Sequence, residues 1–201
     1  MGAPALTLKK AGIMLPELLQ HVSLFSVLHQ IDKDFAEHYR QSGCPYCHGK
    51  LCYAPYYRKP RGGPEDIPQE YTLRLSLCCS KEGCRRRVLP PSCLFMGRNV
   101  YWRAVILIVV TLRQGKPQRR SINKLQKMFS ISRKTIVRWI HYFRQAFPKS
   151  SQWQRLRGRL SARVGNDNLP GRLLTYFFSY YSSISEGLIG CLRFLASGHK
   201  Q

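Results

Sequence analysis

The sequence predicts an α+β protein in which a small cysteine-rich segment with short strands precedes a three-helix unit, with helical extensions at both ends. Three observations support this prediction. Five of the eight cysteines stand in two groups, at Cys44–Cys47 and Cys78–Cys84. Apolar residues recur at helical spacing between residues 99 and 147. No acidic residue lies between residues 83 and 166, a stretch of 84 residues that holds 20 Lys and Arg.

The charge of the chain predicts a polyanionic partner. The 201 residues include 33 Lys and Arg against 10 Asp and Glu, for a formal net charge of +23. A hydrophobic fraction of 44% is ordinary for a folded protein and excludes a disordered basic tail. Such a charge destabilises a compact chain by self-repulsion unless a polyanion offsets it. Nucleic acid is the leading predicted partner, and an anionic membrane surface is the second.

No segment of the sequence is typical of a membrane span. The most apolar run, Ala104–Leu112, has nine residues, whereas a span needs roughly 20. The apolar stretch at Ala11–Leu15 is too short for a signal peptide. We therefore expect a cytoplasmic protein with no membrane partner. Its cysteines are then expected to be thiols or metal ligands rather than disulfides.

The N-terminal part and the segment between the cysteine groups carry simple patterns. Residues 15–40 are predicted to be helical, because apolar residues such as Leu18, Phe25 and Leu28 recur at helical spacing. Tyr71–Leu77 alternates between apolar and polar residues and predicts a strand.

The two cysteine groups predict a zinc ribbon. Cys44-Pro-Tyr-Cys47 is a CxxC turn, and the second group begins 31 residues after Cys47. Two such turns facing each other across a hairpin supply the four soft ligands that a tetrahedral zinc ion needs. Neighbouring strand residues point to opposite faces, so only one of Cys78 and Cys79 can readily be a ligand. We predict structural Zn²⁺ held by Cys44, Cys47, Cys79 and Cys84, with Cys78 as the alternative to Cys79.

Other residues are weaker candidates for this site. Cys52 and Cys93 are rival ligands, but for these two and for Cys191 the commoner role is that of a small buried hydrophobe. His48 is a further candidate next to Cys47. A redox role for the CxxC motif would need a helix start in a βαβ unit, which the sequence does not offer. Four protein ligands would close the metal and make it non-catalytic.

Residues 121–140 predict a helix-turn-helix. Leu125 and Phe129 face inward from a first helix, and Ser130 takes the turn. Ser132 is a suitable N-cap for a second helix that directs Ile136, Trp139 and Ile140 toward the core. Residues 99–113 would form the supporting third helix.

The match to the helix-turn-helix pattern is incomplete. The turn position, which is often Gly, is Ser130, and Gln126 stands where a small residue is expected. An ordinary amphipathic helix pair therefore remains the alternative.

In a helix-turn-helix, the N-terminal residues of the second helix enter the major groove. Arg133, Lys134 and Arg138 are the predicted contacts to bases and phosphates. Arginines after the last cysteine and in the 155–163 segment are predicted to bind phosphates. The full set of predicted DNA contacts is Arg85, Arg86, Arg87, Ser132, Arg133, Lys134, Thr135, Arg138, Arg155, Arg157 and Arg159.

Together these motifs show a resemblance to known proteins. The Cys-Pro-x-Cys ribbon, the run Cys84-Arg-Arg-Arg-Val-Leu-Pro-Pro91 and the helix-turn-helix resemble the N-terminal DNA-binding part of bacterial insertion-sequence transposases. The stretch Arg58-Lys-Pro-Arg-Gly-Gly63 is similar to short transposon-associated ribbon proteins. The resemblance covers roughly residues 43–147. It implies a prokaryotic, nucleoid-associated protein that binds double-stranded DNA.

The sequence lacks a complete catalytic constellation. Transposases of the carboxylate-triad class hold two Mg²⁺ ions with three Asp or Glu, but only Asp167 and Glu186 follow the helix-turn-helix. The tyrosines of the aromatic run at 176–181 lie at helical spacing, where core or partner packing is their commoner role. We therefore expect a protein that is not an enzyme by itself.

These expectations divide the chain into four parts: an N-terminal helical segment (1–42), a zinc ribbon (43–92), a helix-turn-helix domain (93–149) and a basic, then aromatic, tail (150–201). The leading functional hypothesis is a sequence-specific DNA-binding protein of a mobile element that recognises element ends or a promoter. One alternative is a transposase or recombinase subunit whose active site another chain completes. Another is an RNA- or membrane-binding interaction module. A transposase or integrase, and a second copy of this chain, are partners that the sequence leaves open.

Overall fold

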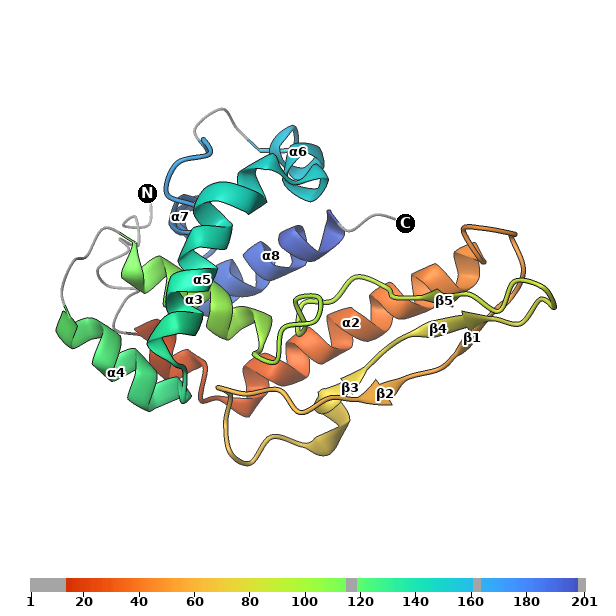
Figure 1. Ribbon diagram of the computed structural model, residues 1–201, viewed down its shortest axis with the longest axis horizontal. Helices are drawn as coiled ribbons and strands as arrows, with labels where there is room; N and C mark the ends of the chain where they lie inside the picture. Colours follow the sequence, from red (N-terminus) through yellow and green to blue (C-terminus); the bar gives the residue numbers. More distant parts are fainter. Residues whose placement is uncertain (1–13, 115–118, 161–163, 199–201) are drawn as a thin grey trace.

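The structure, a computed structural model, describes residues 14–114, 119–160 and 164–198. It has a helical body at one end and a three-stranded β-sheet at the other, joined by the long helix α2 (Val22–Ser42), and a second, two-stranded sheet lies near the middle of the molecule (Figure 1). The predicted α+β class is confirmed. The molecule is elongated, with β1 (Leu51–Tyr53), β4 (Leu77–Cys79) and β5 (Arg87–Val88) near one end and α4 (Arg119–Phe129) near the other (Figure 1).

Helix α2 contributes to both ends of the molecule. Its first half buries Leu24, Phe25 and Leu28 in the helical body, whereas Tyr39 packs against the sheet. The Tyr53 hydroxyl donates a hydrogen bond of 2.9 Å to Glu37, which also binds Arg40 at 2.7 Å. These hydrogen bonds, first that from Arg40, lower the pKa of Glu37 to about 2. They attach the second half of α2 to β1.

The predicted helix over residues 15–40 is interrupted in the structure. Residues 14–18 are helical, a turn follows, and α2 begins at Val22. Gln20 N–H donates to Glu17 and His21 N–H to Leu18, which closes the turn. The change of direction lets Leu19 and the first half of α2 all reach the same core.

Two small antiparallel sheets follow α2. The first has the order β1 (Leu51–Tyr53), β4 (Leu77–Cys79), β5 (Arg87–Val88). The second pairs β2 (Tyr56–Tyr57) with β3 (Leu73–Arg74).

The strand predicted over Tyr71–Leu77 is divided in the structure. It consists of the end of the 3₁₀ helix η1 (Gln69–Thr72), then β3, and then the first residue of β4. Residues 74–77 are all buried, so the alternation in the sequence does not separate a core face from a solvent face. The buried Arg74 instead donates to the carbonyls of Leu75 and Pro90.

The helical body is built around α3 (Arg103–Arg113), in which residues 103–111 are all buried. The helices α4 (Arg119–Phe129) and α5 (Arg133–His141) follow α3 along the chain. A π-helical turn, η2 (Tyr142–Ala146), and a 3₁₀ turn, η3 (Phe147–Lys149), come next. The remaining helices of the body are α6 (Ser151–Arg157), α7 (Gly171–Tyr180) and α8 (Ile184–Ser197). Residues of the N-terminal segment, the three-helix unit and the tail therefore share one core.

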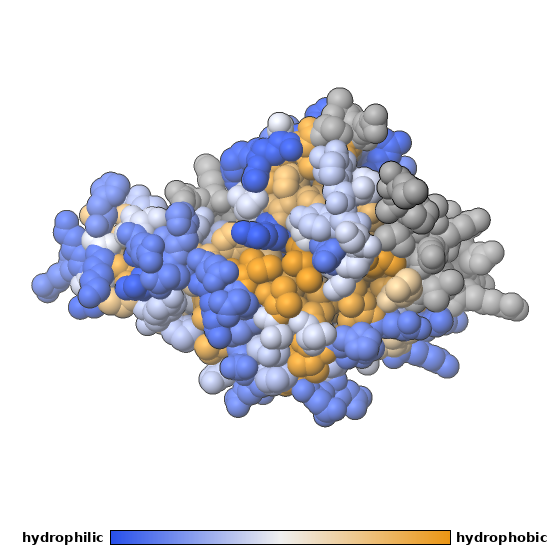
Figure 2. All heavy atoms as spheres, turned by 180° about the vertical axis from the view of Figure 1, so that it is seen from behind, coloured by the Kyte–Doolittle hydropathy of each residue, from blue (hydrophilic) through white to orange (hydrophobic). Residues whose placement is uncertain are grey.

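A second, much smaller core lies beneath the cysteines. It contains Tyr39, Leu51, Leu77 and Val88 together with the cysteine side chains. On the face opposite to that of Figure 1, hydrophobic residues gather near the middle of the molecule, and the sheet end is mostly hydrophilic (Figure 2). Among the described residues, no helix has the length and apolarity that crossing a bilayer requires.

Candidate metal centre and nucleic-acid interface

Four cysteine sulfurs meet at the sheet end of the molecule. The Sγ atoms of Cys44, Cys47, Cys79 and Cys84 all lie within 4.8 Å of one another. Cys44 and Cys84 are 3.8 Å apart, and Cys47 and Cys79 are 3.5 Å apart. Four sulfurs at about 2.3 Å from a tetrahedral zinc would be about 3.8 Å from one another. These four residues could hold a metal ion, and their donor set and spacing fit zinc.

Two backbone turns bring the cysteines together. In the first, His48 N–H donates to Cys44 O, and Cys44 N–H donates to Gly49 O. In the second, Cys84 N–H donates to Lys81 O at 3.1 Å, and the chain passes through Gly83 at φ 79°. The β1–β4 pairing, with Leu51 opposite Cys79, places the two turns side by side.

Backbone amides also face the sulfurs. Burial alone would raise the pKa of the Cys44 thiol, but hydrogen bonds from the amides of Tyr46 and Cys47 and contacts with the neighbouring thiols lower it to about 7. The Cys79 sulfur faces the Lys81 amide and the Cys84 sulfur faces the Arg86 amide, which lower the pKa of each thiol, but burial and the neighbouring thiols outweigh them and raise both pKa values. Amides directed at sulfur stabilise the thiolate, which is the form that binds a metal.

Gly49 is a residue of this site that the sequence reasoning missed. A Cβ atom at this position would lie 2.9 Å from the Lys81 Cβ, 3.1 Å from the Cys79 Sγ and 3.3 Å from the Cys47 Sγ. The CxxC-His-Gly sequence contained the signal, because a glycine after such a turn permits close approach of the second turn.

We expect Gly49→Ala to weaken metal binding on the order of tenfold, because the added methyl group must push two sulfurs apart. A competition titration with a chromogenic chelator measures this affinity. Gly158→Ala is the matched control, since a Cβ there meets nothing within 4 Å. Equal affinities of the two variants would contradict the steric role of Gly49.

The remaining cysteines lie outside the cluster. Cys78 points away from it, with its Sγ 3.4 Å from the carbonyl of Arg85, and Cys52, its partner across the strands, is exposed. Cys93 and Cys191 are buried in the core of the helical body. His48 is exposed and is not among the clustered ligands.

At the other end of the molecule, α4 and α5 form a helix pair. Leu125, Phe129 and Ile131 are buried, and Ile131 N–H donates to Gln126 O across the turn. Ser130 takes the turn at φ 50°, and its carbonyl accepts a hydrogen bond from Tyr101 at 3.2 Å. This bond to the segment before α3 stabilises a conformation that is unfavourable for a non-glycine residue.

The start of α5 presents its polar residues to solvent. The Ser132 hydroxyl accepts a hydrogen bond of 3.2 Å from the Thr135 amide and thus caps the helix. Arg133, Lys134 and Arg138 are exposed, whereas Ile136 and Trp139 are buried and Ile140 is half-buried. Thr135 is half-buried, and its hydroxyl lies 2.9 Å from that of Ser132.

The predicted phosphate-binding arginines differ in the hydrogen bonds that they donate within the chain. Arg85 and Arg157 are exposed. Arg87 donates to the Ser76 hydroxyl at 3.0 Å, Arg155 to the Gly198 carbonyl at 2.7 Å and Arg159 to the Ser197 hydroxyl at 2.9 Å. Arg163 lies outside the described residues.

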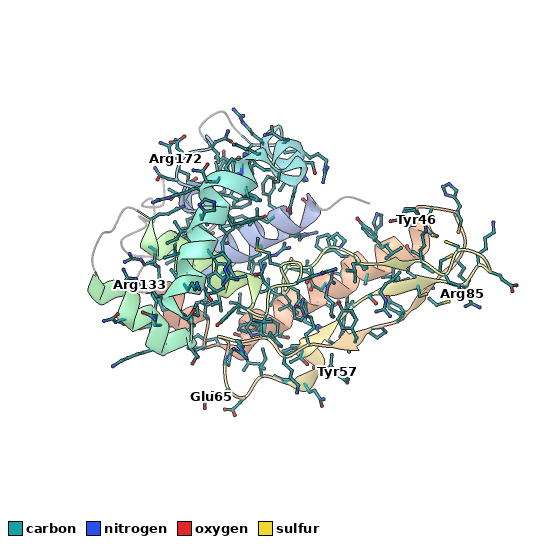
Figure 3. All side chains as sticks on the ribbon, in the orientation of Figure 1. Tyr46, Tyr57, Glu65, Arg85, Arg133 and Arg172 are labelled. Atoms are coloured by element: carbon teal, nitrogen blue, oxygen red, sulfur yellow. The ribbon has the colours of Figure 1, made fainter. Side chains whose placement is uncertain are left out.

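The predicted contacts do not form one patch. Arg85 lies at the sheet end of the molecule, and Arg133 lies at the opposite end, beside α4 (Figure 3). The structure therefore separates the arginines that follow the last cysteine from the start of α5.

Exposed tyrosines are a second feature that sequence reasoning missed. The Arg86 guanidinium lies 4.5 Å from the centre of the Tyr46 ring, and that of Arg87 lies 5.5 Å from the Tyr56 ring. Tyr46 and Tyr57 are each about 60% exposed. No sequence periodicity marks these residues, because the sheets bring them together.

Comparisons with protein-family models, curated proteins and solved structures return no match to this chain.

Proposed function

We propose that this chain is a DNA-binding protein of a mobile element, non-catalytic by itself, that recognises element ends or a promoter. The observation that carries the proposal is the start of α5. There, Arg133, Lys134 and Arg138 project into solvent from a capped helix held against α3. A rigid, exposed and basic helix start is the element that reads base edges in the major groove.

Charge also supports a DNA partner. No acidic residue occurs between residues 83 and 166, so no carboxylate from this stretch would repel a phosphate near α5. The link to a mobile element rests on the motifs shared with insertion-sequence proteins.

The proposal includes a structural Zn²⁺ ion bound by the four clustered cysteines. Its role would be to fix a segment whose own core consists of only a few apolar side chains. With four thiolate ligands, this ion would leave no position for a substrate.

Paired substitutions in α5 test the assignment of the recognition helix. We expect Arg133→Ala with Arg138→Ala to reduce the preference for cognate over random DNA by about 10- to 100-fold for each base that is no longer read. Arg157→Ala in α6 should weaken both DNAs alike, because a phosphate contact carries no sequence information. Competition binding with a selected site and a scrambled duplex measures both effects.

Thermal unfolding provides a control for the double variant. The double variant removes no buried group, so its thermal unfolding should match that of the unmodified protein. Equal reductions of affinity on cognate and scrambled DNA would contradict base reading by α5.

The exposed tyrosines favour a second candidate, binding of single-stranded nucleic acid. Tyrosine rings beside arginines, as at Tyr46 and Arg86, can stack on unpaired bases. Tyr57→Ala should weaken binding to a single-stranded oligonucleotide and leave duplex binding unchanged if this candidate is correct. A tighter affinity for single strands than for any duplex would favour it over the first.

A further inference from the structure

A cavity of about 400 Å³ lies between the second sheet, the loop at 96–99 and the start of α3. This volume falls in the range of small-molecule sites, about 300–1,000 Å³. Four arginines line the cavity, namely Arg58, Arg74, Arg98 and Arg103, and none of its lining residues is acidic. The feature is separate from both the cysteine cluster and the start of α5.

Arg103 is one of the residues that line this cavity, and it also lines two neighbouring cavities. It is the first residue of α3 and is only 8% exposed. Its Nε and Nη1 groups are buried and have no hydrogen-bond partner in the described part of the chain. Burial lowers the pKa of Arg103, yet an arginine stays charged in proteins. A buried cation with unpaired donors is costly, and the negative charge of an anion in the cavity would offset the charge of this guanidinium.

The nearby carboxylate does not fill this role. Asp32 acts on Arg103 through its charge, but its oxygens accept hydrogen bonds from the Ser92 hydroxyl and the Cys93 amide. Burial raises the pKa of Asp32 to about 6. The negative charge of one buried carboxylate therefore offsets only part of the positive charge of the four arginines.

Two of the arginines hold the walls in place. Arg74 donates to the carbonyls of Leu75 and Pro90, at 3.0 and 2.5 Å. Arg58 donates to the carbonyls of Gly97 and Asn99, at 2.7 and 2.9 Å. Carbonyl partners leave the charge of each guanidinium uncancelled, so both arginines make the cavity electropositive. Arg98 is exposed on the loop that Arg58 fixes.

We propose that this cavity binds a phosphate group, which the positive charges of Arg103 and the exposed Arg98 among its lining residues would attract. Apolar contacts with Leu89 and Phe95 would accommodate the uncharged part of the ligand. The phosphate could belong to a mononucleotide or to the end of a DNA strand. The inference does not depend on base reading by α5.

Calorimetry on the full chain tests the site with inorganic phosphate, adenosine monophosphate, and a duplex with or without a 5′ phosphate. We expect Arg98→Ala and Arg103→Met to weaken binding of adenosine monophosphate on the order of 10- to 100-fold, the effect of removing a charged hydrogen bond. Arg85→Ala is the control, since Arg85 is exposed at the sheet end of the molecule (Figure 3). It should bind adenosine monophosphate like the unmodified protein.

The outcomes separate the two phosphate sources. Tight binding of the mononucleotide indicates a small ligand, whereas a preference for the 5′-phosphorylated duplex that Arg98→Ala abolishes indicates a DNA end. If Arg103→Met fails to fold, the Arg98→Ala variant, whose residue is exposed, provides the test of the site.

Failure of both phosphate and mononucleotide to bind at millimolar concentration, with no preference for the phosphorylated duplex, would overturn the proposal. Equal affinities of the Arg98→Ala and Arg85→Ala variants for adenosine monophosphate would also overturn it. Arg133→Ala should leave the affinities for inorganic phosphate and adenosine monophosphate unchanged, so failure of base reading by α5 and failure of this site are distinguishable.

Discussion

Cys47→Ser is expected to abolish binding of the proposed metal ion and to unfold the segments around the cysteines, residues 43–53 and 77–88, while the helical body stays folded. The physical reason is the division between the two cores. The small core beneath the cysteines has few apolar side chains, whereas the helical body buries a large set of its own. Structural zinc sites have apparent binding free energies of about 10–16 kcal/mol, far more than a core of that size supplies. Metal analysis and limited proteolysis measure the two effects.

Cys78→Ser is the matched control for this prediction. Cys78 is adjacent to a predicted ligand, but its sulfur contacts the carbonyl of Arg85 rather than the cluster. This variant should keep its metal and resist proteolysis like the unmodified protein. A metal-free Cys47→Ser protein that remains fully folded would show that the site is not structural. Loss of metal from Cys78→Ser alone would instead show that the ligand set is wrong.

The affinity for DNA is expected to fall steeply with salt. If about 6–10 phosphates are neutralised, the affinity should decrease about 10³–10⁵-fold between 50 and 200 mM salt, because each contact releases condensed counterions. Binding isotherms on one duplex over this range measure the slope. An affinity that does not change with salt would exclude a phosphate-based interface.

The salt slope also distinguishes between two modes of binding. Arg85 and Arg133 lie at opposite ends of the molecule (Figure 3). A duplex that contacts only Arg133, Lys134 and Arg138 would lose only about 40-fold in affinity over the same range. The full slope would require further phosphate contacts. If the sheet end supplies them, the slope should drop when Arg85, Arg86 and Arg87 are all replaced by Ala.

Local patterns in the sequence predicted much of the architecture. The α+β class and the apolar character of α3 follow from spacing and composition. The burial of Leu125, Phe129 and Ile136 follows from helical periodicity, which determines the face of a helix that packs inward. The two cysteine turns are also local, and Cys79 rather than Cys78 enters the cluster because adjacent strand residues point to opposite sides.

Features that depend on long-range packing could not be predicted in this way. The strand pattern at Tyr71–Leu77 failed because the chain is covered on both sides there, and a buried Arg74 is satisfied by distant carbonyls. The Arg103 cavity joins residues from three separate segments, so no single motif marks it. Likewise, the separation of Arg85 from Arg133 depends on the course of α2, which periodicity does not reveal.

The packing of α2 against α8 has a consequence for the order of folding. These two helices are in contact although about 150 residues separate them along the chain. During synthesis the N-terminal helices emerge first, but the apolar residues of α2 cannot be fully covered until α8 has been made. Contacts between such distant segments also slow folding, because the long intervening loop must close first. Chains shortened before residue 184 should therefore aggregate or be degraded.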